Sequence, residues 1–304
     1  MEQKLKLKKQ VASLSVISNS LLVVLKLVVG LFTGSVSIIS EAAHSGVDLI
    51  AACIAWLAVR KSSKPPDAEH AYGHGKIENL SGAIEALLIM LAAVWIVYEA
   101  AEKLLIGGMI LNLDYGIGVM LISIVANYFV SRRLFAVARA TGSQALEADA
   151  MHLSADIWTS IGVLAGLTAV KLTGLTWLDP LIALLVSVVI FRAGYKMTRK
   201  SVYELMDISL PPEEEERIRE IICQHPSVIN CHELRTRRSG AVKMVDVHLV
   251  LHKDMHLDKA HAVCDEIEAS LKSYLKECDV VIHLEPCGYH GDLGACPLQD
   301  GYSK

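Results

Sequence analysis

Long hydrophobic runs separated by short polar loops fill the first two thirds of the chain. A membrane-spanning helix needs about 20 mostly apolar residues to cross the hydrocarbon core. Helices of a soluble core are the alternative, but repeated runs of this length favour a multi-pass α-helical membrane protein with six transmembrane helices. The predicted spans are 11–32, 37–59, 79–101, 114–131, 149–170 and 177–196.

The pattern changes after residue 208. Pro211 and Pro212 mark a boundary, and shorter elements with a helical period or a strand-like alternation follow it. Their order, αββαβ, predicts a small C-terminal α+β domain. These elements are a helix at 213–225, strands at 228–236 and 243–251, a helix at 257–275 and a strand at 279–284. We therefore expect a transmembrane domain (1–208), a metal-binding cytoplasmic domain (209–290) and a C-terminal tail (291–304).

Composition agrees with a membrane protein. Hydrophobic residues make up 53% of the chain and charged residues 20%, with a mean hydropathy of +0.41. Ordinary globular chains are less apolar and more charged. The net charge of −4 argues against a nucleic-acid binder.

Lysine and arginine are distributed asymmetrically among the loops. The side with few cations carries Lys103 and Lys171. Since cytoplasmic loops are enriched in lysine and arginine, the other side, which holds both termini, is predicted to be cytoplasmic. Its cations are Lys4, Lys6, Lys8, Lys9, Arg60, Lys61, Lys64, Lys76, Arg132, Arg133, Arg139, Lys196, Arg199 and Lys200.

The N-terminus and the cysteines add two expectations. The first apolar run continues for a full membrane span with no small-residue cleavage site after it, so we expect a retained span and not a signal peptide. The seven cysteines are odd in number and irregularly spaced. Reduced thiols in a cytosolic domain are the simplest interpretation.

Two predicted spans carry the same polar motif. His44 and Asp48 lie in the second span, and His152 and Asp156 lie in the fifth. The spacing i, i+4 places both side chains of a pair on one helix face. A His–Asp hydrogen bond inside the bundle is the structural alternative for either pair. Two facing copies would offer two imidazoles and two carboxylates, a set that suits a tetrahedral divalent transition ion, zinc above all.

Further ligand candidates lie outside the spans. Asp67, His70 and His74 fall within a glycine-containing loop, where the alternative is a polar loop with a helix cap. In the C-terminal domain, most isolated surface histidines bind nothing, but their alternation along strands and an i, i+4 pair favour a carboxylate-bridged two-ion site. Its candidates are His232, His248, His261, Asp265, His283 and Glu285.

These motifs together resemble the cation diffusion facilitator family over about residues 8–290, and most closely its bacterial zinc exporters. The resemblance rests on the paired His-x-x-x-Asp motifs, the loop from Asp67 to Lys76, and the stretches His232–Arg237, Asp246–His248 and Ile282–Cys287. It implies a homodimer in the cell inner (plasma) membrane, in contact with membrane lipid, with a ferredoxin-like cytoplasmic domain. It also implies a charge contact between protomers through Lys76 and Asp207.

Two positions depart from the family pattern. Some bacterial members have aspartate where this chain has His44, and the family associates the two-histidine form with tighter selectivity for zinc over cadmium. Several relatives have aspartate at the position of Glu285, which keeps the charge but changes the reach of the side chain. The resemblance otherwise assigns the four intramembrane residues to transport and the C-terminal set to a site between two cytoplasmic domains.

The sequence therefore predicts a transporter and not an enzyme. It would exchange cytosolic Zn²⁺ for protons by alternating access, with Zn²⁺ also bound as a structural and regulatory ion. No G-x-x-x-x-G-K-[ST] phosphate loop occurs, which argues against ATP as the energy source. The alternatives are an exporter of iron, cobalt or nickel, or a membrane-anchored metal sensor. Manganese is disfavoured because it prefers oxygen ligands.

Overall fold

The computed structural model describes residues 2–33, 36–106, 114–175 and 177–288. The chain divides into two compact units, Met1–Leu205 and Met206–Lys304. The predicted tail, 291–304, lies outside the described residues.

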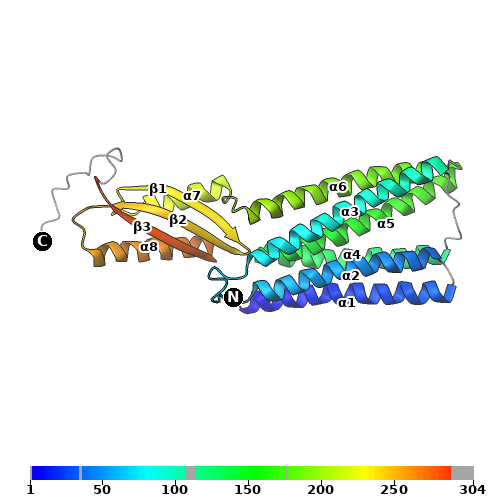
Figure 1. Ribbon diagram of the computed structural model, residues 1–304, viewed down its shortest axis with the longest axis horizontal. Helices are drawn as coiled ribbons and strands as arrows, with labels where there is room; N and C mark the ends of the chain where they lie inside the picture. Colours follow the sequence, from blue (N-terminus) through cyan, green and yellow to red (C-terminus); the bar gives the residue numbers. More distant parts are fainter. Residues whose placement is uncertain (1, 34–35, 107–113, 176, 289–304) are drawn as a thin grey trace. The chain divides into compact units, whose positions relative to one another are not determined.

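Six long helices form the first unit (Figure 1). Each helix is longer than the apolar run that predicts it, because the helical backbone continues into the polar residues at its ends. The helices are α1 (Glu2–Thr33), α2 (Val36–Ser62), α3 (Lys76–Ile106), α4 (Asp114–Thr141), α5 (Gln144–Thr173) and α6 (Leu178–Leu205).

Four stretches of the described residues are long and apolar enough to cross a membrane by length and composition. They are Gln3–Phe32, Lys76–Leu105, Met120–Thr141 and Leu178–Leu205. These lie in α1, α3, α4 and α6, so the described residues support four of the six predicted spans. Large apolar side chains such as Phe32, Trp95 and Leu185 are exposed on the outside of these helices, as expected where lipid replaces water.

Small side chains let the helices approach closely. α1 packs on α2 and α4, α5 contacts α2, α3, α4 and α6, and α3 pairs extensively with α6. One buried cluster joins α1, α2, α4 and α5, and it includes Ala12, Ala58, Ala138, Ala145 and Ala150. Such residues are typical of helix interfaces in membranes, where association depends on close van der Waals packing.

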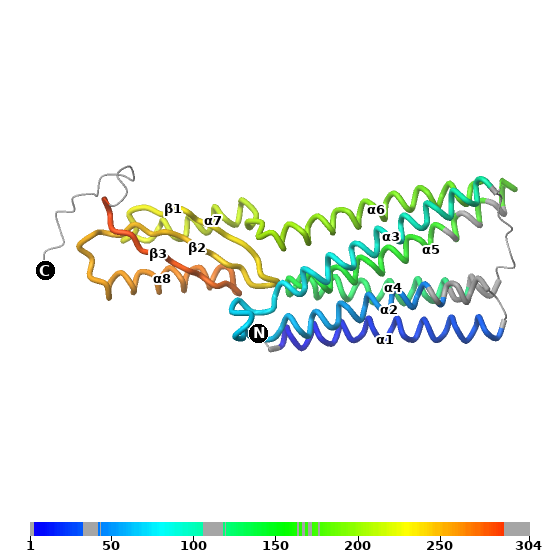
Figure 2. Tube along the Cα trace, viewed as in Figure 1, coloured from blue at the N-terminus to red at the C-terminus, as the bar shows by residue number. Residues whose placement is uncertain are grey.

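The second unit is an α+β domain with the predicted element order. It contains α7 (Pro212–Cys223), β1 (Asn230–Ser239), β2 (Val242–Leu251), α8 (Leu257–Leu275) and β3 (Cys278–Pro286). The strands form a sheet in the order β1-β2-β3, in which β2 is antiparallel to β1 and parallel to β3. The path from β2 through α8 to β3, which a parallel pair requires, can be followed in Figure 2.

Both helices of this domain cover the same face of the sheet. Ile218 and Ile222 of α7, together with Ile267 and Leu271 of α8, join alternate residues of β2 such as Val247 in one buried cluster. Because strand side chains alternate between faces, the residues between the buried ones, including His248, lie on the opposite face. The core therefore fixes which face of the sheet carries the histidines.

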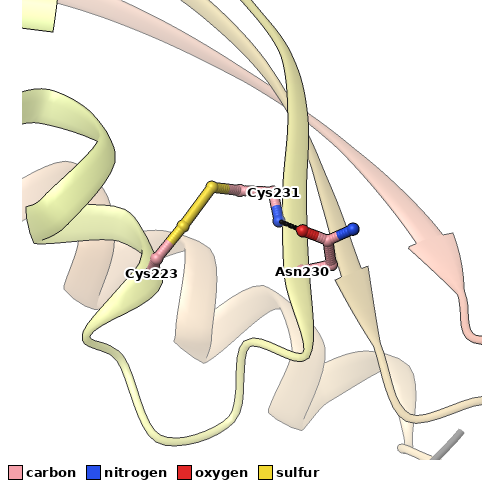
Figure 3. Close-up of a disulfide and its surroundings, with 3 residues drawn as sticks. All are labelled: Cys223, Asn230 and Cys231. Atoms are coloured by element: carbon pink, nitrogen blue, oxygen red, sulfur yellow. Dashed lines mark hydrogen bonds between the residues drawn. A yellow bond between two sulfur atoms is a disulfide. The ribbon is translucent and has the colours of Figure 1, made fainter. Parts of the chain in front are cut away.

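A disulfide joins Cys223, at the end of α7, to Cys231 in β1 (Figure 3). The expectation of reduced thiols is wrong for this pair. The loop between them turns back through a hydrogen bond from the Val228 amide to the His225 carbonyl (3.0 Å), and the two Cα atoms lie 6.4 Å apart. This separation is within the range that a disulfide can bridge. The described free cysteines are Cys53, Cys264 and Cys278.

Gly194 is required for the contact between α3 and α6. A Cβ atom at this position would lie 2.9 Å from the Met90 side chain and 3.3 Å from the Ala86 carbonyl oxygen. We expect Gly194→Leu to destabilise the purified protein by about 1–3 kcal/mol, because it overpacks this interface. Thermal unfolding in detergent measures the effect. Gly118→Leu in α4 is the matched control, since a Cβ atom there meets nothing within 4 Å; an equal loss in both variants would contradict the assignment.

Candidate functional site

The polar motifs of α2 and α5 meet inside the helical unit. His152 Nε2 lies 3.1 Å from Asp48 Oδ1, and the two side chains are only 6% and 8% exposed. Ionisable groups at such positions in a membrane helix are costly unless they are paired or bind an ion. The contact therefore joins the two predicted motifs across a helix interface.

His44 and Asp156 complete this group, which we call the intramembrane site. His44, Asp48 and Asp156 each offer one ligand atom, and these atoms all lie within 4.8 Å of one another. Asp156 Oδ2 and His152 Nδ1 are buried without a hydrogen-bond partner among the described residues. His152 joins the group through its contact with Asp48 and is not one of the three residues whose ligand atoms converge. Imidazole nitrogens and carboxylate oxygens are ligands that suit a divalent cation.

Helix contacts fix the position of α5 beside this group. The Ser131 hydroxyl of α4 lies 2.9 Å from the Ser154 hydroxyl and donates to the Ala150 carbonyl at 3.2 Å. These contacts lie on α5 next to His152. They restrain the rotation of the helix that carries half of the ligand set.

Two ionisable side chains of the helical unit, outside the two motifs, are also buried. Lys26 is 6% exposed, and its ammonium donates to the Ser45 hydroxyl at 2.8 Å, so it does not extend towards the membrane surface. Glu85 is fully buried and accepts a hydrogen bond from Ser81 at 2.9 Å. The sequence marks both as unusual, but it does not reveal their contacts.

Glu78 is a buried acid that the hydrophobic pattern does not reveal, because the predicted third span begins one residue after it. It is 2% exposed and accepts hydrogen bonds from Lys8 (3.0 Å), Ser62 (2.9 Å) and Ser143. The four residues belong to α1, α2, α3 and the turn before α5. Glu78 thus ties together one end of the helical unit.

The loop between α2 and α3 brings Asp67, His70 and His74 together, each with a ligand atom within 4.8 Å of the others. Asp67 Oδ1 lies 3.2 Å from His70 Nδ1, and Asp67 Oδ2 lies 3.2 Å from His74 Nε2. Gly73 adopts φ +79°, which lets the chain turn back between the two histidines. The arrangement is compatible with a metal site on an exposed loop.

Backbone hydrogen bonds hold the Asp67 carboxylate in this loop. The amide groups of His70 and Glu69 donate to Asp67 Oδ1 at 2.8 and 3.1 Å. The His70 amide is the main cause of a pKa of Asp67 below its ordinary value of 3.8. A lowered pKa means that the ionised carboxylate supports the folded loop at neutral pH, and this support is lost as the pH falls below about 4.

Three histidines form a row across the sheet of the second unit. His232 of β1 pairs in register with His248 of β2, and His248 pairs with His283 of β3. Glu285 lies beside this row, 3.0 Å from His232 Nε2, 2.8 Å from His248 Nδ1 and 3.8 Å from His283 Nε2. His232, His248 and Glu285 each have a ligand atom within 4.8 Å of the others.

The remaining predicted ligands of this domain lie elsewhere in the same chain. His261 and Asp265 are 3.8 Å apart on α8, and their side chains are 76% and 63% exposed. They lie on the outer surface of a helix whose other surface, including Ala260 and Val263, packs into the core. Within one chain, the sheet therefore separates them from the histidine row.

The expected charge contact between Lys76 and Asp207 concerns two protomers and stays a prediction. Within its own unit, Asp207 lies 3.4 Å from Arg237 Nη1 and adopts φ 59°. Asp207, which follows the end of α6, thus has Arg237 as a partner within its own unit.

The described residues combine four helices that are apolar enough to cross a membrane, acids and imidazoles that meet between helices, and a separate α+β domain. The cation efflux transmembrane domain family matches residues 12–206, and the cytoplasmic domain family of cation efflux proteins matches residues 210–287. The chain belongs to the cation diffusion facilitator family. Members of this family are cation efflux transporters and not enzymes.

Individual relatives cover most of the chain. The uncharacterized transporter sll1263 of Synechocystis is 34% identical over 263 residues, which are 86% of this chain and 85% of the relative. The cation-efflux pump FieF of Pectobacterium atrosepticum is 33% identical over 265 residues, with 87% and 88% covered. A solved structure of CzrB in a Zn form is 37% identical and covers 27% of this chain and 96% of its own, with a TM-score of 0.26.

The role of Asp67 in the loop is directly testable. We expect Asp67→Asn to speed amide hydrogen exchange in the peptide containing Glu69 and His70 at pH 7, because a neutral amide accepts more weakly from the backbone than a carboxylate. Glu69→Gln is the control, because the Glu69 side chain is exposed and next to the same turn. Unchanged exchange in Asp67→Asn would show that the carboxylate does not order the loop.

Proposed function

We propose that the protein exports zinc from the cytosol in exchange for protons by alternating access. The proposal includes six transmembrane spans, both termini in the cytoplasm, the cell inner membrane as location and a ferredoxin-like cytoplasmic domain in a homodimer. The observation that carries it is the buried 3.1 Å contact between His152 and Asp48, with His44 and Asp156 beside it.

The donor set supports zinc as the transported ion. Two imidazole nitrogens and two carboxylate oxygens suit tetrahedral Zn²⁺, whereas Mn²⁺ prefers oxygen ligands. The two carboxylates would neutralise the charge of the ion where the surroundings are apolar. Iron, cobalt and nickel use similar ligands, so competition for flux in vesicles ranks these ions against zinc.

The same side chains account for coupling to protons. Histidine binds a metal ion only through a neutral nitrogen, so protons and metal compete for His44 and His152. Protons that enter from the outer side would favour release of the ion there. The export direction then follows from the proton gradient across the membrane.

The cytoplasmic histidine row supports a regulatory zinc site between two copies of the chain. His232, His248 and Glu285 converge within one copy, while His261 and Asp265 are displayed outward on α8. Metal held between two such domains would stabilise the dimer and bias it towards a transport-competent state. Lys76 and Asp207 would add a charge contact between the protomers.

Transport through the intramembrane site predicts that Asp48→Ala and His152→Ala lower zinc affinity by about 100-fold or more and abolish zinc uptake into inverted vesicles. Uptake is measured with and without an imposed proton gradient. Glu102→Ala, which removes an exposed carboxylate near the end of α3, is the control and should transport normally. Normal uptake by Asp48→Ala would refute the site, and a protein that binds zinc but moves none would be a sensor.

A regulatory role of the row predicts that His248→Ala weakens zinc-dependent dimerisation by about tenfold while transport through the intramembrane site remains. Analytical ultracentrifugation of the full-length protein, with zinc and with a chelator, measures the dimer. His256→Asn is the control, because it removes an imidazole outside the row and keeps an acceptor at the start of α8. If His248→Ala dimerises with zinc as the unmodified protein does, the row has no such role.

A further inference from the structure

A lysine ammonium is buried beside the intramembrane site. Lys26 comes from α1, and its Nζ atom donates at 2.8 Å to the hydroxyl of Ser45, which follows His44 on α2. Lys26 and Ser45 are 6% and 5% exposed. A third helix thus places a positive charge next to the motifs of α2 and α5.

Burial of this charge needs compensation. A lysine inside a membrane helix costs several kcal/mol unless it reaches water or an opposite charge. A neutral hydroxyl supplies a hydrogen bond but no negative charge. Asp156, an acid of the intramembrane site, lies within electrostatic range of Lys26 and contributes to this compensation.

The ammonium acts on the site by charge and not as a ligand. A protonated amine has three donors and no free electron pair, so it cannot coordinate a metal ion. Its positive charge instead repels a divalent cation and attracts the carboxylates that would bind that cation. The two effects have the same sign, because both disfavour the loaded site relative to the empty one.

We propose that Lys26 is a built-in counter-cation of the transport site, which weakens cation binding and stabilises the carboxylates after the ion has left. The proposal deepens the function proposed above, since it rests on transport through His44, Asp48, His152 and Asp156. Lys26 is then a positioning residue that sets affinity and release. A site with two carboxylates and no lysine ammonium nearby would bind the transported metal ion more tightly and release it more slowly.

The test separates the charge of Lys26 from its hydrogen bond. Lys26→Gln keeps a donor for Ser45 and removes the charge, Lys26→Met removes both, and Lys26→Arg keeps the charge. Ser45→Ala removes the acceptor and keeps the lysine. Equilibrium binding of radioactive zinc to the full-length purified protein gives Kd. The zinc that Asp48→Ala still binds is subtracted as background. Uptake into inverted vesicles gives KM and the maximal uptake rate.

We expect zinc affinity to depend on whether the side chain at position 26 is charged. Lys26→Gln and Lys26→Met should each bind zinc on the order of tenfold more tightly, with a lower KM and a lower maximal rate, because release becomes slower. Lys26→Arg and Ser45→Ala should stay within about threefold of the unmodified protein. A purely structural lysine would instead give weaker binding in Lys26→Met and in Ser45→Ala.

The proposal is overturned if Lys26→Gln binds zinc with unchanged or weaker affinity, or if Ser45→Ala reproduces its tighter binding. Lys26→Gln provides this comparison even where Lys26→Met fails to fold. Failure of the proposed transport function gives another result: Asp156→Ala would then bind and transport zinc as the unmodified protein does, whatever the Lys26 variants show.

Discussion

The cost of placing charged side chains inside an apolar helical bundle is the constraint on which the rest of this structure depends. Asp48 and His152 meet this cost by pairing across α2 and α5 at 3.1 Å. Their pairing requires the two helices to face each other with the motifs at the same depth. The small residues of the interface and the serine contacts between α4 and α5 make that approach possible.

The same constraint explains the other buried charged side chains. Glu78 is buried where three donors converge on it, and Lys26 is buried where the Ser45 hydroxyl and the Asp156 carboxylate lie nearby. The cytoplasmic domain follows a different rule. Its apolar residues cover one face of the sheet, so in-register strands align three histidines on the other face.

Much of the fold follows from local patterns, because helix and strand periods are set by the backbone. The predicted helix at 257–275 coincides with α8, and alternation along β2 separates Val247 from His248. Tertiary contacts carry no such local signal. The disulfide between Cys223 and Cys231 depends on how a loop closes, and the role of Glu78 depends on partners up to 70 residues away. The outward display of His261 depends on which surface of α8 meets the core.

The central claim is that four side chains of α2 and α5 bind one divalent cation. X-ray absorption at the zinc edge tests it in full-length protein whose loop and cytoplasmic ligands have been replaced. We expect one retained zinc ion per chain with two nitrogen and two oxygen ligands at about 2.0–2.2 Å and no sulfur. Failure to retain zinc, or a shell with sulfur or with oxygen alone, would contradict the account.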